Sequence, residues 1–329
     1  MSSRPRVTVL DDWDGSLARS SGISRMREIA DVEVLQQALH DCTADELARI
    51  EVMMAVRERT VFDRAMFDRL PSLRLILQSG GHAYHIDAEA ARERNIVVTL
   101  GRRSMAPRAA VPELTFALMI GALRHLPEAT RQMAAGNWPR LGGRSLAGKR
   151  LGLLGTGRHG ARVAEVARAF GMDVVAWSRP GSSGNEPKIP RLPLPELLAT
   201  SDVISVHLKV SSQTRGLLSR EQLQAMKPRS VLVNTSRGAL VDETALVEVL
   251  RDGPLAAAGL DVFTIEPLPA DSELRVLPNV MLTPHIGWTV EEVLEEFASI
   301  AADQLRDYLG GVLDPDELLP EAAKPEWMT

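Results

Sequence analysis

A glycine-rich turn near the middle of the chain lies between a predicted strand and a predicted helix. The apolar run Leu151–Leu154 leads into Gly155-Thr-Gly157-Arg-His-Gly160, and the amphipathic segment Ala161–Phe170 follows. Strand, glycine turn and helix in this order are typical of a βαβ unit, whose parallel strands are covered by helices. The turn therefore predicts an α/β fold built on a parallel sheet.

The rest of the chain repeats this alternation of short β-branched runs and longer amphipathic segments, which is the pattern of doubly wound sheets. The predicted strands form two series, one before residue 101 and one after residue 150: Val7–Leu10, Val32–Leu35, Val52–Val56, Leu73–Leu77 and Ile96–Leu100, then Leu151–Leu154, Val174–Ala176, Val203–Val206, Val231–Asn234, Ala257–Leu260 and Val280–Leu282. Predicted helices include Thr43–Arg49, which opens with a capping-box spacing, and Asp87–Arg94. The stretch 101–112 is rich in Gly, Arg and Pro and predicts a break before the helix Glu113–Arg124.

The length of 329 residues is more than one small core needs and fits two domains. After Pro284, an apolar stripe at helical spacing from Val290 to Leu305 predicts a terminal helix that needs a surface to cover. We expect this helix to return to the first domain. Residues 1–104 and 288–329 would then form one domain, and residues 105–287 an inserted second one. The tail after Gly311 is predicted to be loose or packed on a neighbour.

Composition excludes several classes of partner. The net charge is −5, and no run of about 18 apolar residues occurs, so we expect neither a nucleic acid nor a membrane as partner. The single cysteine, Cys42, cannot form an intramolecular disulfide or a thiolate metal cluster. The chain starts without an apolar signal region, and we expect a cytoplasmic protein.

The glycine turn also predicts a dinucleotide site. Gly155 permits the tight turn, Gly157 lets the backbone approach a pyrophosphate, and Gly160 lets helix and strand pack closely. The free N–H groups of the helix N-terminus attract phosphate. A glycine turn without a ligand is the alternative. The predicted cofactor-binding residues are Gly155, Gly157, Arg158, His159, Gly160, Ser178, Arg179, His207, Thr235 and Asp261.

The end of the next predicted strand bears on the choice of cofactor. NAD-binding folds usually place a carboxylate there, against the ribose 2′-hydroxyl, whereas this chain reads Ala176-Trp177-Ser178-Arg179. Ser178 and Arg179 suit a 2′-phosphate, with Arg179 as the charge partner, so NADP(H) is favoured over NAD(H). If Arg179 is solvated instead, NAD(H) serves.

Three charged or titratable residues follow successive strands of the second series. Arg237, Glu266 and His285 each stand beside Gly or Pro in the loop after an apolar strand. Cofactor-binding α/β sheets bind their ligands at the carboxyl ends of the strands. Each residue alone has a simple explanation, as a surface charge, a loop carboxylate or a histidine in a turn. Together they predict one site at the edge that the glycine turn marks.

At this point the chain resembles the D-isomer-specific 2-hydroxyacid dehydrogenase family over nearly its whole length. The motifs that carry the resemblance are the glycine turn, Asn234-Thr-Ser-Arg-Gly238, Leu260-Asp-Val-Phe263 with Glu266-Pro267, and Thr283-Pro-His-Ile-Gly287. The resemblance implies a Rossmann dinucleotide-binding domain inserted into a flavodoxin-like substrate domain. It also implies a homodimer formed through the dinucleotide-binding domain.

The resemblance further implies roles for the site residues. Arg237 would hold the substrate carboxylate and polarise its carbonyl, and His285 would donate and accept the proton with Glu266 as its partner. Asp261 would approach the nicotinamide carboxamide. These are the roles that the matching positions have in the family.

Hydride transfer to a 2-oxo acid requires these residue types, whatever the family of the protein. Hydride delivery to a ketone carbon leaves an alkoxide that needs a proton, and histidine titrates near neutral pH. An adjacent carboxylate favours the imidazolium form. An arginine binds a carboxylate through two charge-assisted hydrogen bonds and fixes one face of the carbonyl. This chemistry predicts hydride transfer between NAD(P)H and a small 2-oxo or 2-hydroxy acid, without a metal, and the resemblance implies that the transfer is D-specific.

The loop Gln78–His82 resembles the carboxylate-binding loop of the family, in which backbone N–H groups bind the substrate. The predicted substrate-binding residues are Ser79, Gly80, Gly81, His82 and Trp288. His82, Tyr84 and His85 stand where small or amide residues are common, which leaves the particular acid open. Arg102 and Arg103 are either an extra cation for a dicarboxylate or solvated side chains, and the second is preferred. Trp288 either walls the pocket or packs under the returning helix.

Alternative functions stay open at this stage. Formate-oxidising members of the family carry glutamine in place of Glu266, which argues against formate, but the three residues do not exclude phosphite oxidation. A dinucleotide-sensing scaffold like the family's transcriptional corepressors also keeps these residues. Against a scaffold, no long disordered or basic extension points to a gene-regulatory partner. Stereospecific catalysis is the preferred prediction.

Overall fold

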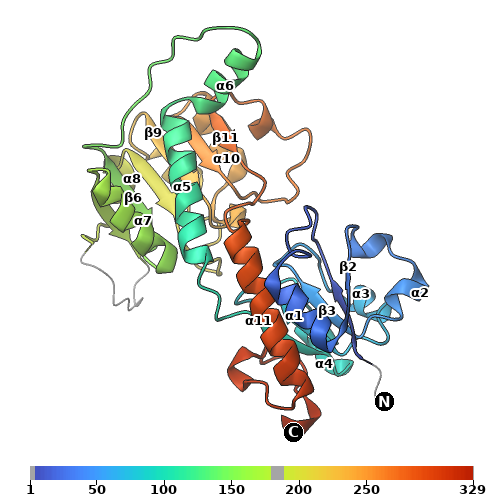
Figure 1. The fold of residues 1–329 in the computed structure, drawn as a ribbon. Coiled ribbons are helices and arrows are strands. Elements are labelled where there is room, and N and C mark those ends of the chain that lie inside the picture. The colour runs from blue at the N-terminus through green and yellow to red at the C-terminus, as the bar shows by residue number, and fades with distance from the viewer. Residues whose placement is uncertain (1–3, 179–188, 329) are drawn as a thin grey trace. The chain divides into compact units, whose positions relative to one another are not determined.

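The computed structural model describes residues 4–178 and 189–328. The chain divides into two compact units: unit 1 comprises Met1–Ala106 and Thr289–Thr329, and unit 2 comprises Pro107–Trp288 (Figure 1). The expected domain boundaries lie one or two residues away (104 against 106, and 288 against 289). Each unit contains one parallel sheet with helices, which is the α/β class predicted from the sequence.

Unit 1 is built on a five-stranded sheet with the order β2-β1-β3-β4-β5. Its strands are β1 (Arg6–Val9), β2 (Asp31–Val34), β3 (Val52–Ala55), β4 (Leu75–Gln78) and β5 (Val97–Leu100). Every pair is parallel. β3, β4 and β5 are buried along their whole length, as expected of strands in a parallel sheet. The predicted strands of the first series are confirmed, with small shifts at their ends.

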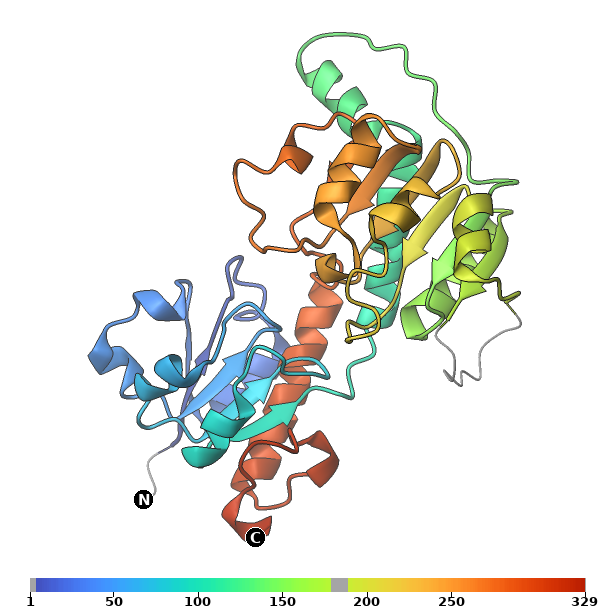
Figure 2. The ribbon, with the colours of Figure 1, turned by 180° about the vertical axis from the view of Figure 1, so that it is seen from behind.

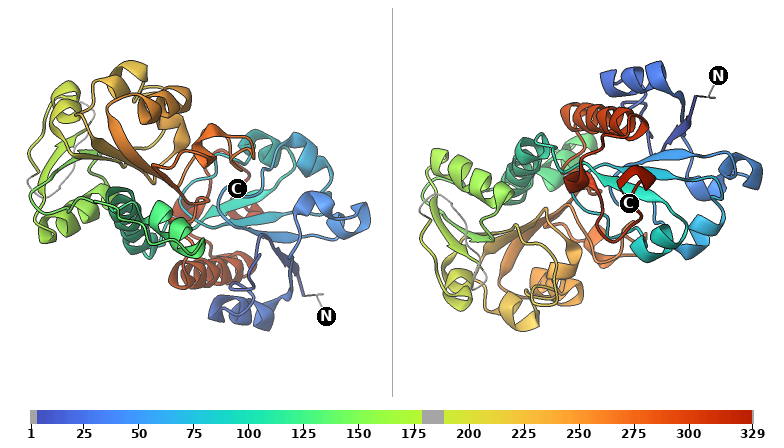
Figure 3. Two further views of the ribbon diagram at one scale, coloured as in Figure 1. Left: turned by 90° about the horizontal axis from the view of Figure 1, so that it is seen from above. Right: turned by 90° about the horizontal axis from the view of Figure 1, so that it is seen from below.

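The helices of unit 1 are α1 (Ser21–Ile29), α2 (Ala44–Leu47), α3 (Arg64–Asp68), α4 (Ala88–Glu93) and α11 (Glu291–Leu309), with 3-10 turns at Leu39–Asp41, Pro315–Glu317 and Glu326–Met328. Thr43 and Glu46 form the predicted capping box of α2. α11 lies beside α1 (Figures 1 and 3). At Gly22 a Cβ would lie only 2.2 Å from the backbone carbon of Ala298, so the two helices approach closely because glycine stands there. The apolar stripe of α11 thus packs within unit 1.

The chain after α11 packs along β5, so the prediction of a loose tail, or one packed on a neighbour, was wrong. The Leu319 N–H donates to the carbonyl of Val98 at 2.9 Å, and the Ala323 N–H donates to that of Ile96 at 3.3 Å. β5 is an edge strand of its sheet, and its edge groups need hydrogen-bond partners. The C-terminal tail provides these partners. Because the tail has no periodic apolar pattern, its sequence alone does not reveal that it pairs with β5.

Unit 2 is built on a six-stranded parallel sheet with the order β11-β10-β9-β8-β6-β7. Its strands are β6 (Arg150–Leu154), β7 (Asp173–Trp177), β8 (Val203–Val206), β9 (Ser230–Asn234), β10 (Leu255–Leu260) and β11 (Val280–Leu282). From β6 the chain runs to β7 on one side and then crosses to β8 on the other. The order therefore reverses beside β6, and such switch points are where α/β sheets bind ligands.

Helices cover both faces of this sheet (Figure 2). The helices of unit 2 are α5 (Pro107–Leu123), α6 (Leu126–Ala134), α7 (Arg158–Ala169), α8 (Leu194–Thr200), α9 (Arg220–Gln224) and α10 (Glu243–Arg251), with 3-10 turns at Gly238–Leu240 and Glu273–Arg275. α6 has no buried residue and does not cover the sheet. Successive residues of a strand point to opposite faces. Val231 and Val233 of β9 belong to the core under α5 and α7, and Leu232 belongs to the core under α8, α9 and α10.

Helix α5 begins at Pro107, six residues before the predicted start at Glu113 (113 − 107 = 6). The predicted break at 101–112 was therefore too long. Pro107 stands at the first helical position, where a proline's missing N–H has no partner to lose. Pro112 lies inside the helix and removes one hydrogen bond, which the burial of this face against the sheet offsets.

No single helix in the described part of the chain is long and apolar enough to cross a membrane. The pair α5 and α6, bent by 69°, meets that criterion by length and composition only.

Candidate active site

The three predicted catalytic residues lie at one edge of the unit 2 sheet. Arg237 follows β9, Glu266 follows β10 and His285 follows β11, and these strands are neighbours. His285 Nδ1 lies 2.7 Å from Glu266 Oε2. The charge of Arg237 is close enough to act on the Glu266 carboxyl. The structure thus brings the three side chains together.

Opposing effects act on the pKa of Glu266. Burial raises this pKa, whereas the hydrogen bond with His285, the charge of His285, the Phe263 N–H (2.9 Å) and the charge of Arg237 lower it, and the net pKa is below its ordinary value. Glu266 is therefore a carboxylate near neutral pH. It holds Nδ1 of the imidazole, so Nε2 is the nitrogen that can exchange a proton with a ligand.

The loop that carries His285 is fixed by Asp261 at the end of β10. The Asp261 side chain, which is 1 % exposed, accepts hydrogen bonds at Oδ1 from Thr283 Oγ1 (2.6 Å) and the Ile286 N–H (2.8 Å), and at Oδ2 from the Gly287 N–H (2.9 Å). His285 has a left-handed backbone with φ +54°, which costs a residue with a Cβ about 1 kcal/mol. The three hydrogen bonds hold this conformation in place.

Asp261 thus has a role that the sequence did not reveal. The resemblance implied a contact with the nicotinamide carboxamide, and that contact stays a prediction. Within unit 2, both oxygens of this carboxyl accept hydrogen bonds that orient the loop of His285, the predicted proton donor. Burial raises the pKa of Asp261, and the hydrogen bonds from Thr283, Ile286 and Gly287 oppose the rise.

The loop that carries Arg237 is fixed in a similar way. Asn234 Oδ1 accepts from the Ser236 N–H (3.0 Å), and Asn234 Nδ2 donates to the Arg237 carbonyl (2.9 Å). A Cβ at Gly238 would lie 2.0 Å from the backbone carbon of Phe263, so the loops after β9 and β10 touch at a glycine. The sequence analysis gave Asn234 no function, although its place at the end of a predicted strand, three residues before Arg237 (237 − 234 = 3), is a signal for such a role.

The glycine turn has the shape that its motif requires. Gly155 has φ +95°, and a Cβ there would lie 2.6 Å from the His207 carbonyl oxygen. A Cβ at Gly160 would lie 2.2 Å from the Gly155 carbonyl oxygen, whereas nothing lies within 4 Å of one at Gly157. Gly157 is the N-cap of α7 and offers no side-chain cap to its first N–H groups. These residues fit a dinucleotide pyrophosphate, which the α7 N-terminus would hold.

The other predicted cofactor residues have diverse surroundings. Ser178 Oγ lies 3.2 Å from Thr156 Oγ1 at the end of the turn, whereas Arg179 lies outside the described residues. Thr235 Oγ1 lies 2.9 Å from Thr115 Oγ1 of α5. Burial lowers the pKa of His207 to about 3, and its Nε2 lies 2.9 Å from Ser205 Oγ, so His207 is a neutral residue that supports the turn. Arg158 and His159 occupy the first turn of α7.

In unit 1, the predicted substrate loop follows β4. Gly80 is buried with φ +94°, and the Ser79 N–H donates to the Ala55 carbonyl (2.9 Å). Within the residues that the structure describes, the N–H groups of Gly80 and Gly81 have no hydrogen-bond acceptor. Gly80 is buried and Gly81 is exposed, and N–H groups without a protein acceptor can donate to a carboxylate ligand. His82 belongs to the same loop.

Arg102 and Arg103 are exposed, as the preferred prediction of solvated side chains expected, and they also bind the C-terminal tail. Arg102 Nη1 donates to the Asp316 carbonyl (2.7 Å), and Arg103 forms an ion pair with the buried carboxylate of Glu317. The long separation along the chain hid these partners. Trp288, the last residue of unit 2, is buried.

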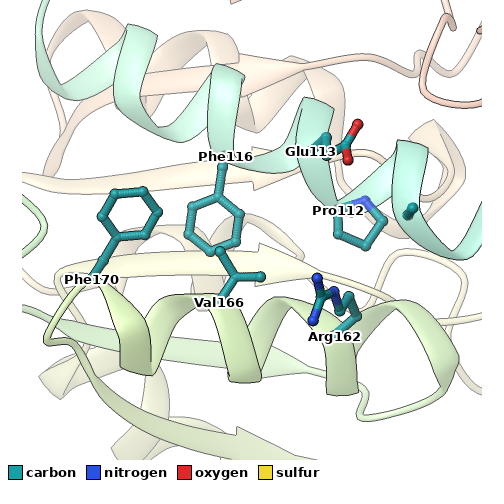
Figure 4. Close-up of a pocket in the computed structure, with 7 residues that line it drawn as sticks. Pro112, Glu113, Phe116, Arg162, Val166 and Phe170 are labelled. Carbon is teal, nitrogen blue, oxygen red and sulfur yellow. The ribbon is translucent and has the colours of Figure 1, made fainter.

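A surface pocket of about 220 Å³ lies elsewhere in unit 2, between α5 and α7 (Figure 4). Its lining includes Pro112, Phe116, Val166 and Phe170, and the rings of Phe116 and Phe170 stack with centroids 5.4 Å apart. None of the predicted site residues lines it, so we do not assign it to the active site. Among the described residues, no group of three or more His, Cys, Asp or Glu side chains is arranged to hold a metal ion.

Known proteins show the same pattern of sequence. Residues 116–287 match the family of D-isomer specific 2-hydroxyacid dehydrogenases, NAD binding domain. D-3-phosphoglycerate dehydrogenase of Methanocaldococcus jannaschii is 35 % identical over 304 residues, which are 88 % of this chain and 56 % of that protein. Glyoxylate reductase of Aeropyrum pernix is 37 % identical over 273 residues, which are 80 % of this chain and 81 % of that protein. The chain thus spans about half the length of the first relative and most of the second.

Solved structures show the same fold. Phosphoglycerate oxidoreductase of Vibrio cholerae O395 superposes with a TM-score of 0.84 at 31 % identity, covering 93 % of this chain and 99 % of that chain. The match to the family covers more than half of the chain and includes the glycine turn, Arg237, Glu266 and His285. The chain therefore belongs to the D-isomer specific 2-hydroxyacid dehydrogenase family, and unit 2 contains its nicotinamide dinucleotide-binding domain.

Proposed function

We propose that this protein transfers a hydride between NAD(P)H and a small 2-oxo or 2-hydroxy acid of D configuration. The observation that carries the proposal is the 2.7 Å contact between His285 Nδ1 and Glu266 Oε2 beside Arg237. These groups lie at the carboxyl edge of a sheet whose glycine turn fits a dinucleotide. Relatives with the names glyoxylate reductase and D-3-phosphoglycerate dehydrogenase support the same reaction class.

The site residues divide the chemistry between them. A bound nicotinamide supplies or accepts the hydride. Arg237 binds the carboxylate of the acid through its guanidinium fork and polarises the neighbouring carbonyl. His285 donates a proton from Nε2 to the carbonyl oxygen during reduction and takes it back during oxidation. The Glu266 carboxylate orients the ring through Nδ1.

A kinetic assay with a panel of 2-oxo acids tests this function. Glyoxylate, pyruvate, hydroxypyruvate, bulkier and dicarboxylic acids are each mixed with NADPH or NADH, and the loss of the reduced cofactor is followed. We expect turnover of at least one acid. If the protein binds the cofactor tightly but turns over no acid, it acts as a dinucleotide sensor, and the enzymatic proposal fails.

We propose NADP(H) as the favoured cofactor. No carboxylate stands at the end of β7 to bind a ribose 2′-hydroxyl, where the chain continues with Ser178 and Arg179. Arg179→Ala is expected to raise the Kd for NADPH about tenfold, because one charge-assisted pair contributes about 1.5 kcal/mol. The Kd for NADH should change less than about twofold. Fluorescence titration measures both, with Arg220→Ala, an exposed arginine of α9, as the matched control. Equal effects on both cofactors would contradict a 2′-phosphate contact.

We also propose a homodimer formed through unit 2. No residue of α6 is buried, and Leu126, Met133, Trp138 and Leu141 of α6 and the following segment are all exposed apolar side chains. Large apolar side chains exposed along one segment are typical of a surface that a second copy covers. Light scattering is expected to give twice the mass of the chain, and a Met133→Ser/Trp138→Ser variant to give the monomer mass at micromolar concentration. A monomeric wild-type protein would contradict the dimer.

We expect the enzyme to be cytoplasmic and without nucleic-acid or membrane partners. The support is the net charge of −5, which provides no positive field for an anionic polymer or surface.

A further inference from the structure

Basic side chains lie at the amino edge of the unit 2 sheet, the edge opposite the candidate active site. Lys149 precedes β6, and Lys227 and Arg229 precede β9. β8 lies between these two strands and is preceded by Asp202. Because the three strands are parallel neighbours, their amino ends lie side by side. The site residues predicted from the sequence include none of these charges.

Asp202 is the carboxylate within this group. Its Oδ1 lies 2.8 Å from Lys227 Nζ, and its Oδ2 accepts from the Arg150 N–H at 2.9 Å. Burial raises the pKa of Asp202, whereas the hydrogen bonds from Lys227 and Arg150 and the charges of Lys227 and Lys149 lower it, and the net pKa is below its ordinary value. The ion pair with Lys227 therefore already uses the charge of this carboxylate.

Arg144 brings a further cation to the same edge. Its N–H donates to the Leu123 carbonyl at the end of α5 (3.0 Å), and the residue is partly buried. Burial and the charge of Arg229 lower the pKa of Arg144, and the charge of Asp202 opposes them. The two guanidinium groups are thus close enough to repel each other. Within residues 4–178 and 189–328, Arg144, Arg229 and Lys149 form no ion pair.

The backbone of Arg229 is also in an unfavourable conformation. The Ser230 N–H donates to the Lys227 carbonyl (3.0 Å), so these residues close a β-turn with Pro228 at its second position. Arg229, at the third position, has φ +65°. A turn with a proline followed by a positive φ usually has glycine or asparagine there. A backbone outlier of this kind is a reason to look for a function of its side chain.

The chain thus keeps an arginine where the backbone favours glycine, beside a second arginine that repels it. An anion between two such groups removes the repulsion, and a guanidinium binds phosphate through two charge-assisted hydrogen bonds. We propose that Arg144, Arg229 and Lys149 form a binding site for a small phosphate-containing anion. This site is separate from the carboxyl edge of the sheet, and the inference goes beyond the proposed function without depending on it.

Calorimetric titration with inorganic pyrophosphate tests this site. The protein is first saturated with whichever of NADPH and NADH it binds more tightly, so that the glycine turn is filled, and KCl keeps the ionic strength constant. We expect one pyrophosphate ion to bind per chain. Arg144→Gln and Arg229→Asn should each raise its Kd at least about tenfold, because each removes a charge-assisted contact.

Matched measurements separate binding from folding. Asparagine tolerates a left-handed backbone, and Arg229→Asn removes one of the two repelling charges, so its Tm without pyrophosphate should equal or exceed that of the wild type. Arg251→Gln changes an exposed arginine of α10 that pairs with Glu273 and should leave the Kd of pyrophosphate unchanged. The Kd of the nicotinamide cofactor should stay within about twofold in every variant, because its site is distant.

The results decide between a ligand site and a solvated or structural group of charges. If the cofactor-bound protein binds no pyrophosphate, or if Arg144→Gln and Arg229→Asn leave its Kd unchanged, the inference is overturned. A lower Tm for Arg229→Asn in the absence of pyrophosphate would also contradict it, because Arg229 would then stabilise the fold by itself. Weaker pyrophosphate binding in both variants, with an unchanged Kd for the cofactor, supports the site.

Discussion

His285→Ala is expected to lower kcat for reduction of a 2-oxo acid by about 10²- to 10⁴-fold, the usual contribution of a general acid. Without the imidazole, the alkoxide formed at the reacting carbon has no proton donor, and water is a poor substitute. The cofactor is held by the glycine turn after β6, so its Kd should stay within about twofold. Steady-state kinetics and fluorescence titration of the cofactor measure the two quantities.

The backbone at position 285 requires a second variant. His285 has φ +54°, and alanine is strained there, whereas asparagine tolerates the left-handed region. His285→Asn should therefore lose the acid and keep the loop that Asp261 holds. Turnover that survives in both variants would rule out His285 as the proton donor, and a loss only in the alanine variant would indicate a structural role.

Arg237→Ala is expected to raise KM and to lower kcat, with a combined loss in kcat/KM of about 10²- to 10³-fold. A charge-assisted fork to a carboxylate contributes about 1.5–3 kcal/mol, and loss of orientation at the reacting carbonyl adds to the effect. Arg237→Lys keeps the charge but not the fork, so its kcat/KM should lie between those of the wild type and the alanine variant. The measurement is kcat and KM for the best acid of the panel.

Arg251→Ala is the matched control, because Arg251 is an exposed arginine of unit 2 that pairs with Glu273. It should leave kcat and KM unchanged. If Arg237→Ala shifts Tm but keeps both kinetic constants, Arg237 is a structural residue and its assignment to the substrate carboxylate is wrong.

The strands could be predicted from the sequence because their signal is local. Parallel strands such as Val231–Asn234 are buried on both faces, and their apolar runs end at polar loops. The helix ends were harder to predict. Pro107 and Pro112 indicated a break, yet a first-turn proline suits a helix, and an interior one is tolerated where the helix packs on a core.

The positions of Arg237, Glu266 and His285 could also be predicted, because each follows a strand of one parallel sheet and the sheet brings the ends of its strands together. What they touch could not be predicted in full. Asp261 lies 24 residues before His285 in the chain (285 − 261 = 24) and holds its loop through backbone N–H groups. Backbone contacts of this kind leave no mark on the sequence of the partner.

Partners far apart in the chain were missed for the same reason. Arg103 pairs with Glu317, and the sequence alone gave the arginine no partner. The side chain of Gln78 donates to the carbonyls of Arg57 and His82, and these contacts depend on the pairing of β3 with β4, which a strand pattern does not specify.

Transfer of deuterium from a reduced cofactor labelled at C4 of the nicotinamide tests the central claim most directly. The wild-type protein is mixed with its preferred 2-oxo acid, and the product is analysed for the position of the label and for its configuration. We predict deuterium at C2 of a D-2-hydroxy acid, and no labelled product from His285→Asn within the same time. A product without deuterium at C2, or one of L configuration, would contradict the proposed hydride transfer.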